Sequence, residues 1–524
     1  MRLSTRWASV VLGTLPAACL TEFPDEPART VTIRTVDWRT ELAVTDVDTL
    51  EIEVKLPDSD TLVTALRVKW QSSDDAVLRL LQLQPPAGAS REDTLATQRR
   101  AEVTGRAGGL VVVSALIQGG GAFEPETISG TIRVTQKWVS VSAGYQHSCG
   151  TTVDSAAFCW GTGLIGNGST RGSPTPSRVI GELKFESVAA GDGHTCGTLV
   201  DGRVYCWGLN PYGAIGDGMP DDQLTPVPVS LGRTFRSVNA GQGYVCGVTT
   251  DATGFCWGDN VAWQLGDGGL VGPRPFPSFE DCGFLAPNLC SRRPRPIQNR
   301  SRQALPLLAV GPGVSHTCAV LIGGDAVCWG TGSKELGSDT PVKTDSTVQG
   351  EPIVNVMGGP KLASLSAGRS HNCGIATLER QAYCWGFNSY GQLGRRSPAS
   401  TATPLPVSDE RRFLRVSAGE KSTCGISAAD SAAYCWGSNE YGQLGTTQVI
   451  ERCGTVSCSM SPIKVQLPDN PKLVSVSVGP KHGCAVTVAG VAYCWGEAAG
   501  GKLGNDSIPD SPTLVNPIRV SEPD

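Results

Sequence analysis

Short segments in which apolar and polar residues alternate recur along the last four-fifths of the chain, with tight turns between them. Residues 204–207 and 237–241 are two examples, and such alternation is typical of half-buried β-strands. Asp201-Gly202 supplies a tight turn between two strands. A unit built this way cannot bury its apolar side alone, so neighbouring units must stack. The pattern therefore predicts an all-β repeat protein.

Cysteine positions mark the repeat most clearly. The tripeptide Cys-Trp-Gly occurs seven times, at intervals of 47 to 72 residues, which is long enough for a four-stranded blade with its loops. A second cysteine precedes each tripeptide by ten or eleven residues. With a turn midway, this spacing places the two cysteines opposite each other on a hairpin, within disulfide reach. The expected pairs are Cys149–Cys159, Cys196–Cys206, Cys246–Cys256, Cys318–Cys328, Cys373–Cys384, Cys424–Cys435 and Cys484–Cys494.

Four further cysteines form two local pairs, Cys282 with Cys290 and Cys453 with Cys458, which leaves Cys19 without a companion. Eighteen paired cysteines indicate a disulfide framework and hence an oxidising, exported environment. Charged residues make up 18% of the chain and the formal net charge is −5. This composition lacks the basic footprint of a nucleic-acid-binding protein, so we expect no nucleic-acid partner.

All five histidines lie two residues before the first cysteine of a repeat, at His147, His194, His316, His371 and His482. Metal binding is the competing interpretation, but metal ligands must converge, and these histidines are spread over five repeats. Two other repeats carry Tyr244 and Ser422 at this position. We expect no metal and no cofactor. The histidines are predicted to hydrogen-bond nearby backbone, and the seven motif tryptophans to pack between blades.

The best-preserved copies show the whole unit. Residues 365–374 read Leu-Ser-Ala-Gly-Arg-Ser-His-Asn-Cys-Gly, and residues 383–394 end in Tyr-Gly-Gln-Leu-Gly. The recurring order of Gly-x-x-His-x-Cys, Cys-Trp-Gly and Gly-Gln-Leu-Gly resembles the repeat of the regulator of chromosome condensation family, here in a bacterial exported form. This resemblance implies a seven-bladed β-propeller over residues 137–520. Only the repeat framework matches, so no residue of a guanine-nucleotide exchange site is carried over, and the export features argue against that activity.

The first 19 residues resemble a bacterial lipoprotein signal. Arg2 and Arg6 precede a short apolar run, and Ala17-Ala18 precede Cys19, which is the candidate lipidated residue. An ordinary secretory signal cleaved near Ala18 is the alternative. Pro16 stands where the lipoprotein motif usually has leucine. Both interpretations imply export, and lipidation would place the protein on the cell envelope surface, as an outer-membrane lipoprotein.

Between the signal and the propeller, residues 20–29 have the composition of a tether. Residues 30–135 contain alternating runs at 30–36, 50–56, 65–70, 110–117 and 127–134, a pattern that suggests a β-sandwich. Trp70-Gln71-Ser72-Ser73-Asp74 resembles a motif of bacterial immunoglobulin-like surface domains. The expected fold is thus a small immunoglobulin-like β-sandwich followed by the propeller.

Fold alone does not fix function. We expect a monomeric binding module for an unidentified protein or polysaccharide, with no catalytic residues. The alternative is an exported hydrolase or lyase with a site on the propeller face, although no nucleophile elbow, zinc-helix motif or phosphate loop is present. Insertions at 267–291, 338–350 and 446–460 follow the Leu-Gly element and are expected on one face. Beside the first insertion, Arg292, Arg293 and Arg295 form a candidate binding site for an acidic partner.

One expectation concerns ring closure. No Pro-x-x-Val strand precedes the first repeat, whereas residues 512–515 supply one after the last repeat. The two ends of the chain are therefore predicted to share a blade, which would remove an exposed sheet edge.

Overall fold

The computed structural model describes residues 32–35, 41–43, 47–55, 66–72, 78–82, 100–105, 109–119, 126–267, 280–281, 289–299, 301–339, 353–448, 451–506 and 514–522. The chain divides into two compact units, the second of which starts at Lys137. The signal segment, Cys19, the tether and Cys282 lie outside the described residues. Where the structure describes the chain, no helix is long and apolar enough to cross a membrane.

The N-terminal unit contains two four-stranded sheets. One has the order β1-β3-β6-β5, with strands Thr32–Thr35, Val47–Lys55, Arg100–Gly105 and Leu78–Gln82. The other has the order β2-β8-β7-β4, with strands Glu41–Ala43, Glu126–Thr135, Gly109–Gly119 and Leu66–Ser72. Five of these strands fall on the predicted alternating runs, whereas β2, β5 and β6 were not predicted. The two-sheet arrangement agrees with an all-β unit, and its immunoglobulin-like character stays a prediction.

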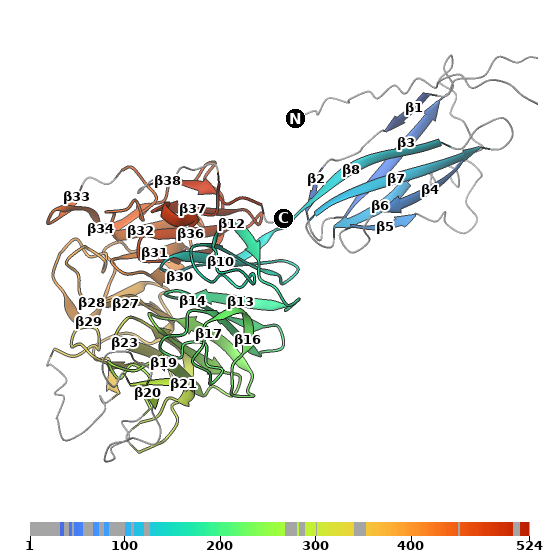
Figure 1. Cartoon of the computed structure of the whole chain (residues 1–524). Helices are drawn as coiled ribbons and strands as arrows, with labels where there is room; N and C mark the ends of the chain where they lie inside the picture. The colour runs from blue at the N-terminus through green and yellow to red at the C-terminus, as the bar shows by residue number, and fades with distance from the viewer. Residues whose placement is uncertain are drawn as a thin grey trace, which may run out of the picture. The chain divides into compact units, whose positions relative to one another are not determined.

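The second unit is a seven-bladed β-propeller, and its blades follow one another around the ring in chain order (Figure 1). Blades 1 to 4 consist of β9–β12 (Trp138–Ala143, His147–Thr152, Ala157–Gly161, Ser173–Arg178), β13–β16 (Phe185–Ala190, His194–Leu199, Val204–Gly208, Gln223–Pro228), β17–β21 (Phe235–Ala240, Tyr244–Thr249, Gly254–Asp259, Glu280–Asp281, Leu289–Pro296) and β22–β25 (Leu307–Pro312, His316–Leu321, Ala326–Gly330, Val354–Asn355). Blades 5 to 7 consist of β26–β29 (Leu362–Ala367, His371–Ala376, Ala382–Gly386, Thr401–Pro406), β30–β34 (Phe413–Ala418, Ser422–Ser427, Ala433–Ser438, Glu451–Cys453, Val456–Lys464) and β35–β38 (Leu473–Val478, His482–Thr487, Ala492–Gly496, Leu514–Arg519). A short 3₁₀ helix, η1 (Ala499–Gly501), lies between β37 and β38.

Each blade is an antiparallel sheet whose second and third strands carry the paired cysteines. Cys149 and Cys159, for example, stand directly opposite each other on β10 and β11. All seven such pairs are disulfides with Cα atoms 4.0–4.1 Å apart. Cys453 and Cys458 are also bonded, and they close the hairpin of β33 and β34. Cys290 is disulfide-bonded as well, whereas its expected partner Cys282 is outside the described residues.

The hydrophobic core of the propeller is divided among the seven interfaces between neighbouring blades. Each motif tryptophan is fully buried in one of these interfaces. It packs on the last glycine of the preceding blade's Gly-x-Leu-Gly element: a Cβ added to Gly216 would lie 2.6 Å from Nε1 of Trp257. Trp257 Nε1 also donates a hydrogen bond of 2.9 Å to the carbonyl of Ala214 in that element. The repeated motif thus encodes contacts between blades, as expected for units that cannot bury their apolar sides alone.

Seven glycines line the axis of the ring. Each inner strand is followed by a glycine, and a Cβ added to any of them would lie 2.8 Å or less from the carbonyl oxygen of the glycine in the next blade. The contacts form a closed circle, because Gly479 of blade 7 meets Gly144 of blade 1. The members are Gly144, Gly191, Gly241, Gly313, Gly368, Gly419 and Gly479. We call this circle the glycine ring.

The prediction that the chain ends share a blade is wrong. β38 is the outer strand of blade 7, and blade 1 has its own outer strand, β12. Each Pro-x-x-Val-like strand is the fourth strand of a blade whose first three strands come before it in the chain. Every blade is therefore complete. Blades 7 and 1 share the tryptophan contact of the other interfaces: Trp160 Nε1 donates to the carbonyl of Lys502 at 2.9 Å.

Deleting residues 510–524 should still destabilise the propeller, for a different reason. The deletion removes β38, and with it the buried side chain of Val520, which packs in the same core cluster as Trp160. Burial of one such side chain stabilises a protein by about 1.5–3 kcal/mol, and the edge of β37 also loses its hydrogen-bonding partner. We expect a lower melting temperature in circular dichroism, and an unchanged value would show that blade 7 does not depend on β38.

Candidate functional site

The propeller has two faces with different connections. We call loop face the side on which each inner strand joins the second strand and each third strand joins the fourth. We call hairpin face the opposite side, which carries the turns between second and third strands. All three insertions follow the third strand of their blade, which ends on the loop face. This agrees with the prediction that insertions at the same position of the repeat share one face. The third insertion folds as the β33–β34 hairpin, which adds a fifth strand to blade 6.

A small cavity of about 120 Å³ opens around the glycine ring on the loop face. Its charged lining residues are Asp192, Arg369 and Glu420. Gln242 donates a hydrogen bond of 3.1 Å to Asp192, and Arg369 forms an ion pair of 3.2 Å with Glu420. Both carboxylates at the mouth are therefore engaged by side chains of a neighbouring blade.

Exposed apolar residues gather on the loop face in blades 2 and 3. Leu209 is 41% exposed and Tyr212 is 37% exposed in the loop after β15, while Val261 is 56% exposed in the loop after β19. Met219, 57% exposed, follows in the same connection as Tyr212. We call these four residues, with Arg293, the blade 2–3 patch. Exposed apolar groups at rigid, clustered positions mark candidate interaction sites.

Buried asparagines hold both loops of the patch in place. Asn210 accepts a hydrogen bond of 3.0 Å from the backbone of Ile215, and Asn260 accepts one of 3.0 Å from Leu265. The Asn210 amide also donates to the carbonyl of Met219 at 2.8 Å. The apolar side chains are therefore presented by loops whose backbone is already ordered, which lowers the entropic cost of binding.

The predicted arginine site is only partly brought together. Gly218 in the blade 2 loop donates a hydrogen bond of 2.9 Å to the carbonyl of Arg292. Arg292 and Arg293 thus border the blade 2–3 patch at the loop-face end of β21, with Arg292 half-buried and Arg293 exposed. Arg295 lies further along β21, where it pairs with Cys256 in the middle of the sheet. Arg302 belongs to the connection on the hairpin face, and Arg300 lies outside the described residues.

Trp263 occupies a strained backbone position beside the patch. The loops of blades 2, 5, 6 and 7 have glycine there, at Gly213, Gly391, Gly442 and Gly501, with φ between 73° and 80°. Trp263 has the same left-handed conformation, with φ of 60°. A non-glycine residue in this region costs on the order of 1 kcal/mol or more. Sequence comparison of the repeats shows the substitution, but only the backbone conformation shows its cost.

The five histidines do not form a site. All are buried, and they point from one blade to the next: His147 Nε2 lies 2.7 Å from Thr195 Oγ1, and His371 Nε2 lies 2.7 Å from Thr423 Oγ1. His316 and His482 likewise contact a side chain of the next blade, Asn372 and Ser148. For these four histidines the partner is thus a side chain across the blade interface, whereas His194 hydrogen-bonds backbone, as predicted. Within the described ranges, no cluster of three or more His, Cys, Asp or Glu side chains could hold a metal ion.

Burial keeps these histidines neutral. Removal from water lowers the pKa of His147, His194 and His316 to about 4, and the pKa of His371 and His482 to about 3. For His147 the nearby His194 lowers the pKa further. These histidines are therefore uncharged at neutral pH, and four of them link neighbouring blades through side-chain hydrogen bonds.

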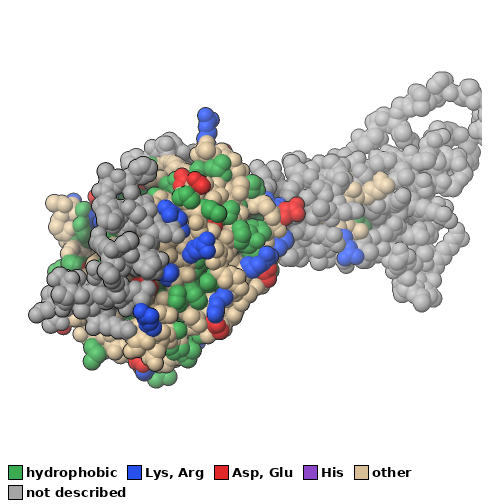
Figure 2. Space-filling model, turned by 60° about the horizontal axis from the view of Figure 1, so that its bottom comes forward, with side chains coloured by type: hydrophobic (Ala, Val, Ile, Leu, Met, Phe, Trp, Pro, Cys, Tyr) green, Lys and Arg blue, Asp and Glu red, His purple; other side chains and the backbone are tan. Residues whose placement is uncertain are grey.

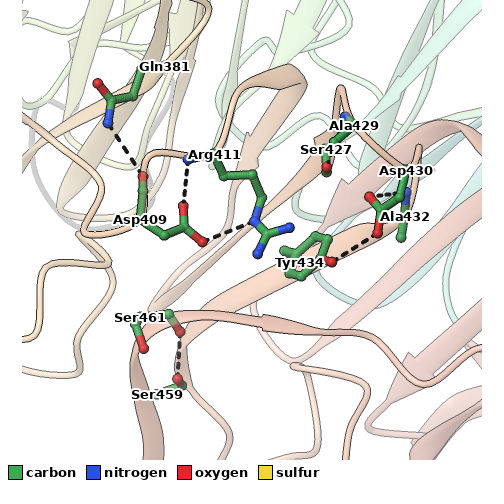
Figure 3. Close-up of polar contacts among 10 residues, drawn as sticks. All are labelled: Gln381, Asp409, Arg411, Ser427, Ala429, Asp430, Ala432, Tyr434, Ser459 and Ser461. Carbon is green, nitrogen blue, oxygen red and sulfur yellow. Dashed lines mark hydrogen bonds and ion pairs between the residues drawn. The ribbon is translucent and has the colours of Figure 1, made fainter.

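Charges on the hairpin face are paired with each other. Figure 3 shows one example between blades 5 and 6: the guanidinium of Arg411 lies 3.6 Å from the ring centre of Tyr434 and forms a 3.0 Å ion pair with Asp409. The Tyr434 hydroxyl donates a 3.0 Å hydrogen bond to Asp430. Burial, and then this hydrogen bond, raise the pKa of Tyr434. Arg203–Asp201, Arg233–Asp251 and Lys361–Asp325 are further pairs on this face.

Exposed aliphatic residues also occur on the hairpin face, one by one at repeated positions. Each inner strand has a register shift after its first residue, and in three blades the extra residue is an exposed aliphatic side chain. This residue is Val139, Leu414 or Val474 in blades 1, 6 and 7. The hairpin turns add Val153, Val200, Ile322, Leu378 and Val488. On the face visible in Figure 2, hydrophobic, basic and acidic side chains are interspersed.

Comparison with known protein families agrees with the repeat pattern. Models described as regulator of chromosome condensation (RCC1) repeat match residues 185–214, 363–392 and 413–443, and residues 201–248, 381–426 and 430–486. Segments of blades 2, 3, 5, 6 and 7 therefore match RCC1 repeats. These matched segments include the Cys-Trp-Gly and Gly-x-Leu-Gly elements that build the blade interfaces, so the RCC1 repeat accounts for the contacts described above.

The chain is also similar in sequence to several characterised proteins. The chain is 29% identical to the ultraviolet-B receptor UVR8 of Arabidopsis thaliana over 230 residues, which cover 43% of the chain and 49% of UVR8. It is 31% identical to the probable E3 ubiquitin-protein ligase HERC3 of Homo sapiens over 182 residues, or 34% of the chain and 16% of that protein. The chain thus spans half or less of the length of these relatives.

The propeller is also similar to the crystal structure of Prp20p from Saccharomyces cerevisiae. The TM-score is 0.57 at 20% sequence identity, and the match covers 74% of this chain and 87% of Prp20p. At this level of identity the likeness establishes the fold alone. The blade 2–3 patch is defined by the residues of this chain, and its description does not depend on the likeness to Prp20p.

Proposed function

We propose that this protein is an exported binding module whose propeller recognises a protein partner through the blade 2–3 patch. The observation that carries the proposal is the grouping of Leu209, Tyr212 and Val261 on ordered loops beside Arg293. An apolar centre with a charged border is the usual composition of a protein interface. Repeats of this type also occur in proteins characterised for protein binding, such as Prp20p with Gsp1p and histones.

The border of the patch favours an acidic partner. Arg292 and Arg293 stand together at one end of β21, in a chain with a formal net charge of −5. Complementary charge at an interface rim mainly accelerates association and confers salt dependence. A protein with acidic residues around an apolar segment fits both parts of the patch, and an acidic polysaccharide is the weaker candidate because it lacks the apolar segment.

The second candidate class is an exported enzyme, a hydrolase or lyase that would act at the cavity around the glycine ring. There Asp192 and Glu420 are the carboxylates, and each is held by a partner side chain. Engaged carboxylates at a shallow mouth support binding more than general acid–base chemistry, which needs a group free to exchange protons with a substrate. Guanine-nucleotide exchange is not proposed.

Export and anchoring belong to the same proposal. The eight disulfides among the described cysteines support an oxidising compartment. Lipidation at Cys19 would tether the protein to the cell envelope surface. The N-terminal unit, as an immunoglobulin-like spacer, would then hold a monomeric propeller away from the membrane.

Quantitative capture with matched variants tests the proposal. The full chain would be crosslinked to its surroundings in the cell envelope, and captured proteins would be compared with those from a patch variant, Tyr212→Glu/Val261→Glu. A hairpin-face variant, Leu378→Glu/Val488→Glu, is the control, since all four residues are exposed and none should alter folding. We expect the patch variant to lose a partner at least about 10-fold, because a buried unpaired charge at an interface costs more than about 1.4 kcal/mol.

Arg293→Glu should weaken capture of the same partner and flatten its dependence on salt concentration. Retention by the patch variant with loss in the hairpin-face variant would move the interface to the opposite face. Equal retention by all variants would overturn binding through either face.

A further inference from the structure

The interface between blades 7 and 1 departs from the repeat on both sides. The loop after the third strand contains an asparagine and a tyrosine two residues apart in blades 5 and 6. These are Asn388 and Tyr390 in blade 5, and Asn439 and Tyr441 in blade 6. Blade 7 has Ala498 and Gly500 at these positions. In blade 1 the loop from Gly161 to Gly166 is three residues shorter than the loop from Gly386 to Gly394. The two altered loops meet because the ring closes between them.

In the regular blades the tyrosine fills the space between neighbouring loops. The Lys421 ammonium lies 4.8 Å from the ring centre of Tyr390, and the Lys481 ammonium lies 4.5 Å from that of Tyr441. Glycine at position 500 provides no such side chain. A hollow of about 410 Å³ is left between blades 7 and 1, and we call it the seam hollow. Its volume lies in the range of small-molecule sites.

The walls of the seam hollow combine polar groups with small apolar surfaces. Hydroxyls of Thr162 and Ser173 lie on the blade 1 side, while Asn505 and Asp506 lie on the blade 7 side, with Pro174 and Leu503 between them. Neither lysine nor arginine is among the lining residues that the structure describes. A carboxylate without a basic neighbour disfavours anionic ligands. Hydroxyl, amide and carboxylate groups together suit a ligand that both donates and accepts several hydrogen bonds.

The backbone around the hollow is fixed by contacts between the two blades. The carbonyl of Lys502 accepts hydrogen bonds from Trp160 Nε1 at 2.9 Å and from Ser148 Oγ at 3.0 Å. The Lys502 ammonium is 7% exposed and forms a 2.5 Å ion pair with Glu497. A Cβ added to Gly501 would lie 2.5 Å from the Cα of Pro174. The hollow is thus a preformed shape, as small-molecule sites generally are.

From this arrangement we infer that the seam hollow binds one residue of a neutral sugar. The Asp506 carboxylate accepts hydrogen bonds from two neighbouring hydroxyls of the sugar, and Thr162 and Ser173 contact the opposite edge. The exposed ring of Pro174 contacts its apolar C–H groups. This site is on the closing seam of the ring and does not depend on the blade 2–3 patch, so either can fail without the other.

Saturation-transfer difference NMR on the full chain tests the site. The probes are methyl glycosides of neutral hexoses and of N-acetylhexosamines, with glucosamine and glucuronate as charged comparisons. We expect at least one neutral glycoside to bind with a dissociation constant of about 1 mM, as is usual for a small polar ligand in an open site. Glucuronate should not bind, because its carboxylate would face Asp506. Preference for glucosamine over every neutral glycoside would overturn the proposal in favour of a cation site.

Variants connect binding to the hollow. Thr162→Phe places in blade 1 the residue that blade 5 has at the same position, Phe387, and should lower affinity at least 10-fold by filling the hollow. Asp506→Asn should weaken binding about 3- to 10-fold, since a neutral acceptor makes weaker hydrogen bonds. The matched control is Phe387→Thr in blade 5, which should leave binding unchanged. Absence of binding by the wild-type chain, or equal binding by Thr162→Phe with an unchanged melting temperature, would overturn the assignment.

Discussion

Acidification from pH 7 toward pH 4 is expected to destabilise the propeller, with the loss beginning near pH 6.5, above the ordinary pKa of carboxylates. Five buried histidines have a folded-state pKa of about 4 or about 3, against 6.5 in an unfolded chain. Below pH 6.5 the histidines of the unfolded state therefore bind protons, whereas those of the folded state stay neutral. The free energy of unfolding decreases as the pH falls. The loss continues until the folded pKa is reached.

Burial is the main cause of the low pKa of these histidines. The hydrogen bonds at the blade interfaces show where the added proton would have to go. Thr423 Oγ1 donates to the carbonyl of Gln392, so it accepts from the Nε2–H of His371. The other ring nitrogen, Nδ1, has no hydrogen-bond partner. Protonation would place a charged N–H group there, buried and unpaired, which is costly. His482 repeats this geometry with Ser148, which donates to the carbonyl of Lys502.

Each histidine whose pKa falls from 6.5 to about 4 removes up to about 3 kcal/mol of stability at pH 4. Urea unfolding followed by tryptophan fluorescence, at pH 7, 6, 5 and 4, would measure the sum. The double variant His371→Gln/His482→Gln keeps an N–H donor but cannot ionise, so its stability should fall less steeply over the same range. An identical slope in the variant, or constant wild-type stability down to pH 5, would contradict neutral burial.

Alanine in the glycine ring is expected to be as damaging as protonation of several histidines. A Cβ on Gly368 would collide with the carbonyl oxygen of Gly419, which directly follows the inner strand of the next blade. Backbone cannot move aside as a flexible side chain can, so blades 5 and 6 would have to separate. Overpacking of this kind costs about 1–3 kcal/mol or more, and here the displacement would be transmitted around a closed circle.

Gly368→Ala should therefore lower the urea midpoint sharply, or prevent accumulation of folded protein. Gly323→Ala is the matched control, because a Cβ there would meet nothing closer than the Asp325 carboxylate at 3.8 Å. That substitution lies in a hairpin turn and should change stability by less than about 0.5 kcal/mol. Similar stability of the two variants would show that the ring adapts, and that glycine is not required at its axis.

Much of the propeller could be predicted because its signals are local. The cysteine pairs span ten or eleven residues, and alternation with a period of two identifies strands within a few residues. The short insertion around Cys453 and Cys458 was likewise visible as a pair. In the N-terminal unit, β2, β5 and β6 escaped prediction because they are short or lack clear alternation.

The functional surface was harder to predict. Arg292 and Arg293 were identified by charge, but Leu209, Met219 and Val261 have no sequence signal, because an apolar residue in a loop is as easily buried as exposed. Arg295 was grouped with its neighbours in the sequence, yet the strand carries it away from the loop face. The seam hollow could have been suspected from Ala498 and Gly500, whose repeat positions elsewhere hold asparagine and tyrosine.

By itself, the sequence determined the number of blades, the strands within them and the disulfide pairs, since these depend on motifs that repeat within one unit. The tertiary structure decided how the units meet. His482 reaches Ser148 across 334 residues of sequence, and Gly479 meets Gly144 at the same closure. Such contacts depend on which two blades become neighbours, and on which strands belong to each blade when the ring closes. Only the assembled ring brings those residues together, and with them the patch and the hollow on its surface.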